Sequence, residues 1–218
     1  FCTNKWNLKR YRLQSKIILV TTAVLILLPA IFFFLSDFAG FSMGKRILAS
    51  FFQSVTLRTA GFNTADLGAM NDSSKAIMTL MMLIGGSPGS TAGGMKTTTI
   101  AVLILNAFAT FGREPETEVF GRRFDNTVVK NAATIAILYF FLFFAGGIAI
   151  SQIEHIALSD CLFETASAVG TAGLTLGITT ELGLVSHLIL VVLMYLGRVG
   201  GLTLIYAAIS VKIQSGAK

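Results

Sequence analysis

A five-residue pattern around a glycine occurs twice in this chain, as Thr59-Ala60-Gly61-Phe62-Asn63 and again 112 residues later as Thr171-Ala172-Gly173-Leu174-Thr175. Each copy follows a short amphipathic segment, residues 43–57 and 158–169, that is too brief to cross a bilayer. A re-entrant helix followed by exposed backbone carbonyls can replace the water shell of a dehydrated cation. The pattern therefore predicts two strands of one ion-selectivity filter.

Long hydrophobic runs place these motifs in a membrane. Of the 218 residues, 54% are hydrophobic and 13% are charged, and the mean hydropathy is +0.74. This composition excludes an ordinary soluble domain and predicts an integral membrane protein. The net charge of +6 lies mostly in short loops, where the positive-inside rule explains it, so we expect no nucleic-acid partner. Basic residues before the first run place the amino-terminal side in the cytoplasm (Lys5, Lys9, Arg10, Arg12 and Lys16).

The two motifs divide the chain into two units with one order of parts: outer helix, half-helix, filter strand and inner helix. An offset of 112 aligns the units without gaps, so that Gly61 matches Gly173 and Gly85 matches Gly197. A parallel repeat implies an axis along the membrane normal, with the pore on that axis. We predict a cytoplasmic segment, a first unit, a cytoplasmic link, a second unit and a cytoplasmic tail over residues 1–16, 17–111, 112–127, 128–211 and 212–218. Within the units, outer helices are expected over 17–35 and 128–150, filter strands over 59–63 and 171–175, and inner helices over 73–111 and 182–211.

The first inner helix is interrupted by ten residues that include five glycines and a proline. Such a stretch cannot remain a regular helix. At membrane depth irregular backbone survives only when it is buried in protein or lines a wet cavity, which places it beside the pore. The alternative is a polar loop that ends the helix on the cytoplasmic side. The stretch consists of Gly85, Gly86, Ser87, Pro88, Gly89, Ser90, Thr91, Ala92, Gly93 and Gly94.

Two glycines and two arginines are the sharpest functional candidates. Gly61 and Gly173 can turn their carbonyls toward the pore and have no side chain to block an ion, although a tight turn alone would also explain them. Arg58 is expected to point away from the pore and to pair with an acid or a carbonyl. Arg198 lies in the middle of the last predicted helix, where an unpaired charge costs roughly 2.5 to 3.5 kcal/mol and must be compensated.

Two acidic residues on the second half-helix, Asp160 and Glu164, are candidate partners of Arg58 or could draw cations to the pore mouth. No cluster of His, Cys, Asp and Glu has metal-site spacing, and no nucleotide-binding or nucleophile motif occurs. We therefore expect a protein that is not an enzyme and needs no cofactor.

Three stretches resemble the Trk/Ktr/HKT potassium transporter superfamily, most closely its bacterial TrkH and KtrB membrane subunits. They are residues 57–64, the loop from Gly85 continuing to Thr99, and Gly197-Arg198-Val199-Gly200. The resemblance covers essentially the whole chain and corresponds to repeats three and four, the C-terminal half, of a subunit that has four such repeats. It implies an all-α membrane protein in which two outer-helix, pore-loop and inner-helix repeats make half of a pseudo-four-fold, potassium-channel-like pore.

The resemblance also implies a function and partners. These are potassium translocation across the cell membrane by a multi-pass subunit, with potassium held by filter backbone carbonyls. The loop 85–94 would be an intramembrane gate, Arg198 an electrostatic barrier below the filter, and Lys96 a residue facing the cytoplasm or a regulatory partner. Expected partners are membrane lipid, the remaining N-terminal half of the same subunit, a second copy in a homodimer, and a cytoplasmic ring of nucleotide-binding regulatory subunits.

Two other interpretations remain at this level. The glycine loop alone would suit a secondary transporter of another small cation or solute, with broken helices and a midplane site. Such transporters usually have inverted or long helical repeats, whereas short re-entrant segments precede both glycine motifs here. A non-transporting membrane scaffold would leave Arg198 and both motifs unexplained, and a charged arginine that is buried beside a carboxylate of a neighbouring helix is the structural alternative for Arg198.

Overall fold

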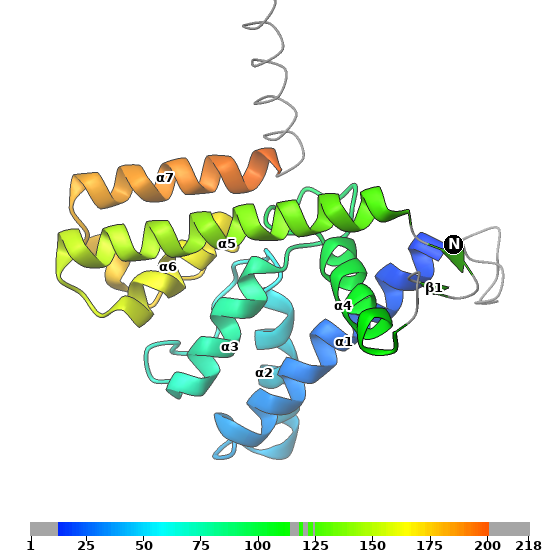
Figure 1. Ribbon diagram of the computed structural model, residues 1–218. Helices are drawn as coiled ribbons and strands as arrows, with labels where there is room; N and C mark the ends of the chain where they lie inside the picture. The colour runs from blue at the N-terminus through cyan, green and yellow to red at the C-terminus, as the bar shows by residue number, and fades with distance from the viewer. Residues whose placement is uncertain (1–12, 114–117, 120–121, 124, 201–218) are drawn as a thin grey trace, which may run out of the picture.

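The computed structural model describes residues 13–113, 118–119, 122–123 and 125–200, and it is built almost wholly from helices (Figure 1). Helices α2 and α6 occupy the positions of the two predicted half-helices. The helices of the described part are α1 (Leu13–Ser36), α2 (Met43–Thr56), α3 (Asp72–Leu83), α4 (Thr97–Phe111), α5 (Asn126–Glu154), α6 (Leu158–Gly170) and α7 (Leu184–Val199), with a short 3-10 helix η2 (Ile178–Glu181).

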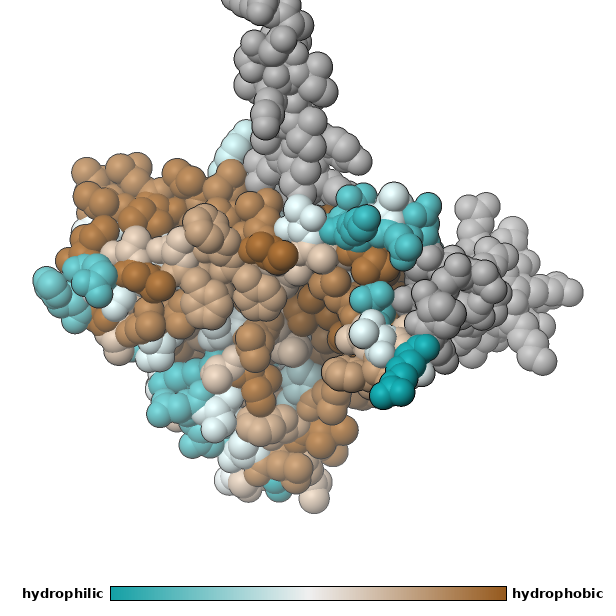
Figure 2. Space-filling model, viewed as in Figure 1, coloured by the Kyte–Doolittle hydropathy of each residue, from teal (hydrophilic) through white to brown (hydrophobic). Residues whose placement is uncertain are grey.

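Two of the described helices, α1 and α5, are long and apolar enough to cross a membrane. Their 24 and 29 residues correspond to about 36 and about 44 Å of helix. Helices α4 and α7 are shorter and also apolar. Hydrophobic surface extends over α5 and α7, and hydrophilic side chains gather at the two ends of α5 (Figure 2). This distribution suits helices that lie in lipid with their ends in water.

The two units are joined through their half-helices and inner helices. Helix α2 packs against α1, and α6 packs against both α5 and α7. Contacts of α3 with α6 and of α4 with α5 connect the first unit to the second (Figure 1). Fully buried side chains fill these interfaces, the largest of them being Tyr139, Phe33, Phe163, Leu57 and Met78. The ends of α2 and α6 are thereby fixed where the filter strands begin.

The first inner helix is broken, as the glycine-rich stretch predicts. Helix α3 ends at Leu83 and α4 begins at Thr97. Between them Ile84 and Met95 form an isolated parallel bridge, and the Gly85 amide donates to the Met95 carbonyl at 2.7 Å. The two ends of the loop 85–94 therefore lie next to each other, between the end of α3 and the start of α4.

Several features of the described part differ from the sequence-based predictions, and three of them have a clear cause. The second inner helix, expected over 182–211, ends at Val199 because Gly200 has a φ of 87°, and residues 201–211 lie outside the described part. Helix α5 begins at Asn126 because the Asp125 carboxylate accepts from the Thr127 amide at 2.9 Å and caps it. The link, in a chain expected to be all-α, contains the antiparallel pair β1 (Glu118–Val119) and β2 (Arg122–Arg123). Strands of two residues are too short to show an alternating pattern.

Candidate functional site

The two predicted filter strands share one backbone conformation and lie side by side. In the first copy φ is 64° at Thr59 and 74° at Gly61, and in the second it is 51° at Thr171 and 85° at Gly173. The alanine between threonine and glycine has a negative φ in both copies. A Cβ at Gly61 would lie 2.5 Å from the carbonyl oxygen of Ala172, so no other residue fits there without movement. A β-branched threonine in the left-handed region is uncommon and typical of functional sites.

Each filter strand is held by hydrogen bonds to the end of its half-helix. The Thr56 hydroxyl donates to the Phe62 carbonyl at 2.6 Å. In the second copy the Ser167 carbonyl accepts from the Ala172 amide at 2.8 Å, and the Ser167 hydroxyl accepts from the Leu174 amide at 3.0 Å. The last turns of α2 and α6 therefore fix the course of the strands that follow them.

Side chains of the two strands are covered unequally. Ala172 and Leu174 are each 3% exposed. Phe62, which corresponds to Leu174, is 70% exposed. Leu174 lines a cavity together with Ser167 of α6 and Leu190 of α7. Asn63 turns back on its own segment and accepts from the Ala65 amide at 3.3 Å.

A buried carboxylate supports the outer end of the second strand. Glu164, 4% exposed, accepts from the Thr175 hydroxyl at 2.6 Å, from the Leu176 amide at 3.0 Å and from the Thr179 hydroxyl at 2.7 Å. It is not a partner of Arg58, which the sequence left open. The position that corresponds to Glu164 in the first unit is Phe52, so only one of the two strands has this support.

The loop 85–94 is bonded to both filter copies and to α7. The Arg58 guanidinium donates to the Gly85 carbonyl at 3.1 Å, which is a carbonyl pairing of the kind expected for this arginine. At the other end of the loop the Gly93 amide donates to the Thr171 hydroxyl at 3.0 Å. The Gly94 amide donates to the Gly197 carbonyl of α7 at 3.2 Å. The loop is therefore fixed at both ends directly beside the filter.

Two positively charged side chains donate hydrogen bonds to carbonyls in the middle of this loop. The Arg198 guanidinium donates to the Thr91 carbonyl, and no described carboxylate pairs with it. The Lys96 ammonium donates to the Ala92 carbonyl, and its side chain is half-buried. The reason is that a broken helix leaves carbonyls without their usual partners, and these cations satisfy two of them.

A pair of carboxylate clamps on the predicted outer face was not found from the sequence. Each joins the end of an outer helix to the start of an inner helix by accepting from the N-cap amide and from the hydroxyl of a serine three residues later. The clamps are Asp37 with Asn71 (3.0 Å) and Ser74 (2.5 Å), and Glu154 with Gly183 (2.9 Å) and Ser186 (2.5 Å). The N-cap residues and the serines are 112 apart, but Glu154 corresponds to Ser42, five residues beyond Asp37. A gap-free alignment of the two units therefore does not match the two clamp carboxylates with each other.

Comparison with known proteins assigns this arrangement to a family. A family model described as the cation transport protein TrkH matches residues 12–217. The chain belongs to the TrkH family. This TrkH-family chain is 35% identical to the potassium/sodium uptake protein NtpJ of Enterococcus hirae and 33% identical to the Ktr system potassium uptake protein B of Bacillus subtilis. The alignments cover 92% and 91% of the chain but only 47% and 46% of those relatives, so the chain spans about half their length.

A solved structure supports the fold of this TrkH-family chain. The crystal structure of the potassium transporter TrkH from Vibrio parahaemolyticus matches it with a TM-score of 0.73 at 22% identity, over 86% of this chain and 43% of that one. The resemblance to bacterial TrkH and KtrB subunits is thus confirmed, as is the helical architecture. The roles of the filter strands, the loop and Arg198 rest on the geometry above.

Proposed function

We propose that this chain forms part of a potassium uptake pore in the cell membrane, with residues 59–63 and 171–175 as two strands of its filter. The paired backbone conformation of these strands is the observation that carries the proposal. An extended strand directs successive carbonyls to opposite sides. Left-handed residues that alternate with right-handed ones turn them toward one side, which is what coordination of a bare cation requires.

Two further features favour a cation at this place. Helices α2 and α6 both end directly before a filter strand, so the negative ends of their dipoles lie beside it. The curated relatives are named as potassium or potassium/sodium uptake proteins. Since the chain spans about half of their length, we assign the other two strands of a pseudo-four-fold filter to an N-terminal half of the same multi-pass subunit. A homodimer and a cytoplasmic nucleotide-binding regulatory ring remain part of the proposal by family resemblance.

The loop 85–94 acts as the gate in this proposal, and Arg198 keeps it closed. An ion that has passed the filter meets a loop fixed by Gly93 to Thr171 and by Thr91 to Arg198. Opening requires the Arg198 bond to break, because that bond connects the middle of the loop to α7. The positive charge of Arg198 also opposes a cation at this level.

Substitution of the filter glycine in the full-length protein tests the function. In cells without other potassium uptake systems, Gly61→Ser is expected to lower potassium uptake and to raise sodium uptake relative to it, because the new side chain meets the Ala172 carbonyl. Gly44→Ser is the matched control, since Gly44 lies in α2 with no atom within 4 Å of a Cβ. Unchanged rate and selectivity in Gly61→Ser would remove the filter assignment.

A further inference from the structure

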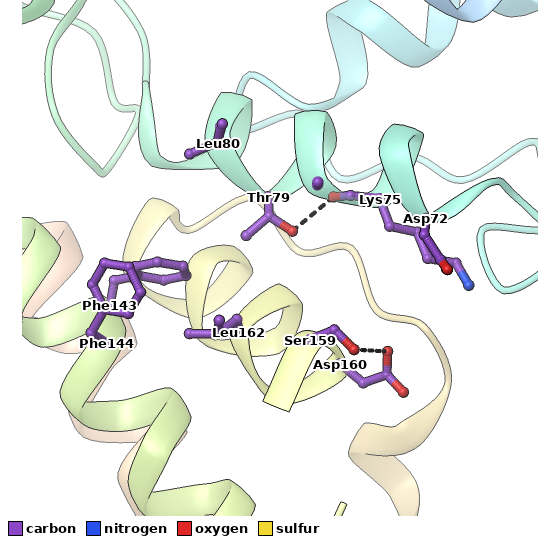
Figure 3. Close-up of a pocket in the computed structure, with 10 residues that line it drawn as sticks. Asp72, Lys75, Thr79, Leu80, Phe143, Phe144, Ser159, Asp160 and Leu162 are labelled. Atoms are coloured by element: carbon purple, nitrogen blue, oxygen red, sulfur yellow. Dashed lines mark hydrogen bonds between the residues drawn. The ribbon is translucent and has the colours of Figure 1, made fainter. Parts of the chain in front are cut away.

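A cavity of about 490 Å³ opens between α3, α5 and α6 and is divided into a polar and an apolar part. Asp72 and Lys75 of α3 line one side together with Asp160 of α6. Phe143 and Phe144 of α5 line the opposite side (Figure 3). None of these residues contributes to the filter, the loop or the clamps described above. The cavity is therefore a separate feature of the fold.

The ammonium of Lys75 is the group in this cavity that lacks a structural explanation. It makes no hydrogen bond or ion pair with any other residue in the described part of the chain; only the backbone of Lys75 is engaged, its amide with the Asn71 carbonyl at 3.0 Å and its carbonyl with the Thr79 hydroxyl at 2.8 Å. Lys75 lies at the end of the first turn of α3, where the helix dipole disfavours a cation. Asp72 and Asp160 lie in the first turns of α3 and α6, where the dipole favours them. An anion beside Lys75 would compensate its charge.

The polar and apolar parts of the cavity are ordered along the membrane normal. Asp72 and Asp160 begin helices on the side predicted to face outward. Phe144 precedes the outer end of α5 at Glu154 by ten residues, which is about 15 Å of helix. The polar groups therefore lie at the level of outer-leaflet headgroups, and the phenylalanines lie within the hydrocarbon.

We propose that this cavity binds one outer-leaflet phospholipid whose headgroup carries both a phosphate and a primary ammonium, that is, a phosphatidylethanolamine. Its phosphate pairs with Lys75, its ammonium donates to Asp72 and Asp160, and an acyl chain lies along Phe144 and Leu80. One cation between two carboxylates matches this zwitterion better than an anionic headgroup, and a choline headgroup has no N–H to donate. The inference rests on the membrane orientation and is independent of the filter assignment.

Native mass spectrometry of the full-length protein in mild detergent tests the site by titration with phosphatidylethanolamine, phosphatidylcholine and phosphatidylglycerol. Wild type is expected to retain phosphatidylethanolamine most tightly, and Lys75→Gln to bind it about tenfold more weakly because one charge-assisted hydrogen bond is lost. Lys45→Gln, which alters an exposed lysine of α2 outside the cavity, should bind like wild type. Equal retention in Lys75→Gln, or equal binding of the other two lipids, overturns the proposal.

A second measurement identifies the occupant directly. Ala76 is exposed and lines the cavity, so a photoreactive residue placed there reports what lies against it in the intact membrane. A lipid adduct supports the proposal. A crosslink to a segment of polypeptide shows that protein fills the cavity, and overturns it.

Discussion

The two repeats of this chain agree at the predicted filter strands and differ at one position of the inner segment, where the first has Gly86 and the second has Arg198. Both have the same φ pattern at threonine and glycine of the filter, and both have a carboxylate clamp. The inner helix ends at Leu83 in the first repeat and at Val199 in the second, and Arg198 of α7 corresponds to Gly86 of the loop 85–94. The two different segments contact each other, because Arg198 donates a hydrogen bond to the Thr91 carbonyl of that loop. The second repeat thus supplies a charged side chain that binds the loop of the first repeat.

The largest expected effect concerns a pair of glycines that correspond in the two repeats. A Cβ at Gly85 would lie 1.9 Å from the Gly93 carbonyl oxygen, and one at Gly197 would lie 2.0 Å from that of Val169. Overpacking against backbone is expected to destabilise Gly85→Ala and Gly197→Ala alike, by about 3 kcal/mol or more. Folded yield and the melting temperature in detergent measure this effect.

Gly40→Ala provides the control for that pair, since a Cβ at Gly40 has no atom within 4 Å. If one of these two variants melts at the wild-type temperature and the other gives no folded protein, the two inner helices are not equivalent at this depth.

The gate is the next test, because it depends on the difference between the repeats. Arg198→Gln removes a charged hydrogen bond to the Thr91 carbonyl and should raise potassium uptake by up to about tenfold. Combining it with deletion of residues 87–91 should add little, since both changes release the same contact. Arg46→Gln is the matched control, because Arg46 donates to the Phe34 carbonyl at 2.7 Å, far from the loop in sequence. If the two changes raise potassium uptake additively, Arg198 and the loop act independently of each other.

Glu164 tests whether the two filter strands are supported independently. Glu164→Gln weakens three hydrogen bonds to the second strand and its continuation, so discrimination of potassium against sodium should fall several-fold. Phe52→Leu changes the corresponding position of the first repeat, where there is no carboxylate, and should leave selectivity unaltered. Competition of sodium with potassium uptake is the measurement, and equal effects of the two substitutions would contradict a role specific to the second strand.

The clamps should respond alike, although they differ in sequence position. Asp37→Asn and Glu154→Gln each replace a carboxylate that accepts from an N-cap amide and a serine hydroxyl. Each is expected to lower the melting temperature by a few degrees. If only one of them does so, the clamps are not equivalent despite their shared geometry.

The smallest effect is a pH dependence that only the second repeat should show. The Thr127 amide holds the pKa of Asp125 below its ordinary value, and Leu13 stands at the corresponding position of the first repeat. A depressed folded-state pKa means that this contribution is present above the unfolded pKa of about 4 and is lost as pH falls through the folded value. Asp125→Asn keeps an acceptor oxygen for the cap but does not titrate, so the difference in melting temperature between the two proteins should change only below about pH 4.

Hydropathy and glycine content were sufficient to predict the parts of the fold that depend on local sequence. The half-helix positions and the break in the first inner helix follow from apolar run lengths and from five glycines with a proline between Gly85 and Gly94. The partner of Arg198 could not be predicted, because a backbone carbonyl has no sequence signature. The clamps were missed because Asp37 and Glu154 are displaced by five residues between the repeats. The end of α7 depends on the positive φ of Gly200, which its sequence among apolar residues does not reveal.

The contacts that fix the loop engage its main chain and leave its central side chains out. Arg58, Thr171 and Arg198 bind the Gly85 carbonyl, the Gly93 amide and the Thr91 carbonyl. Thr91 is exposed, whereas Gly89 has a φ of 81°, which disfavours any other residue there. Natural variation and engineering can therefore change the exposed side chain of Thr91, while the attachment of the loop depends on residues that lie outside it.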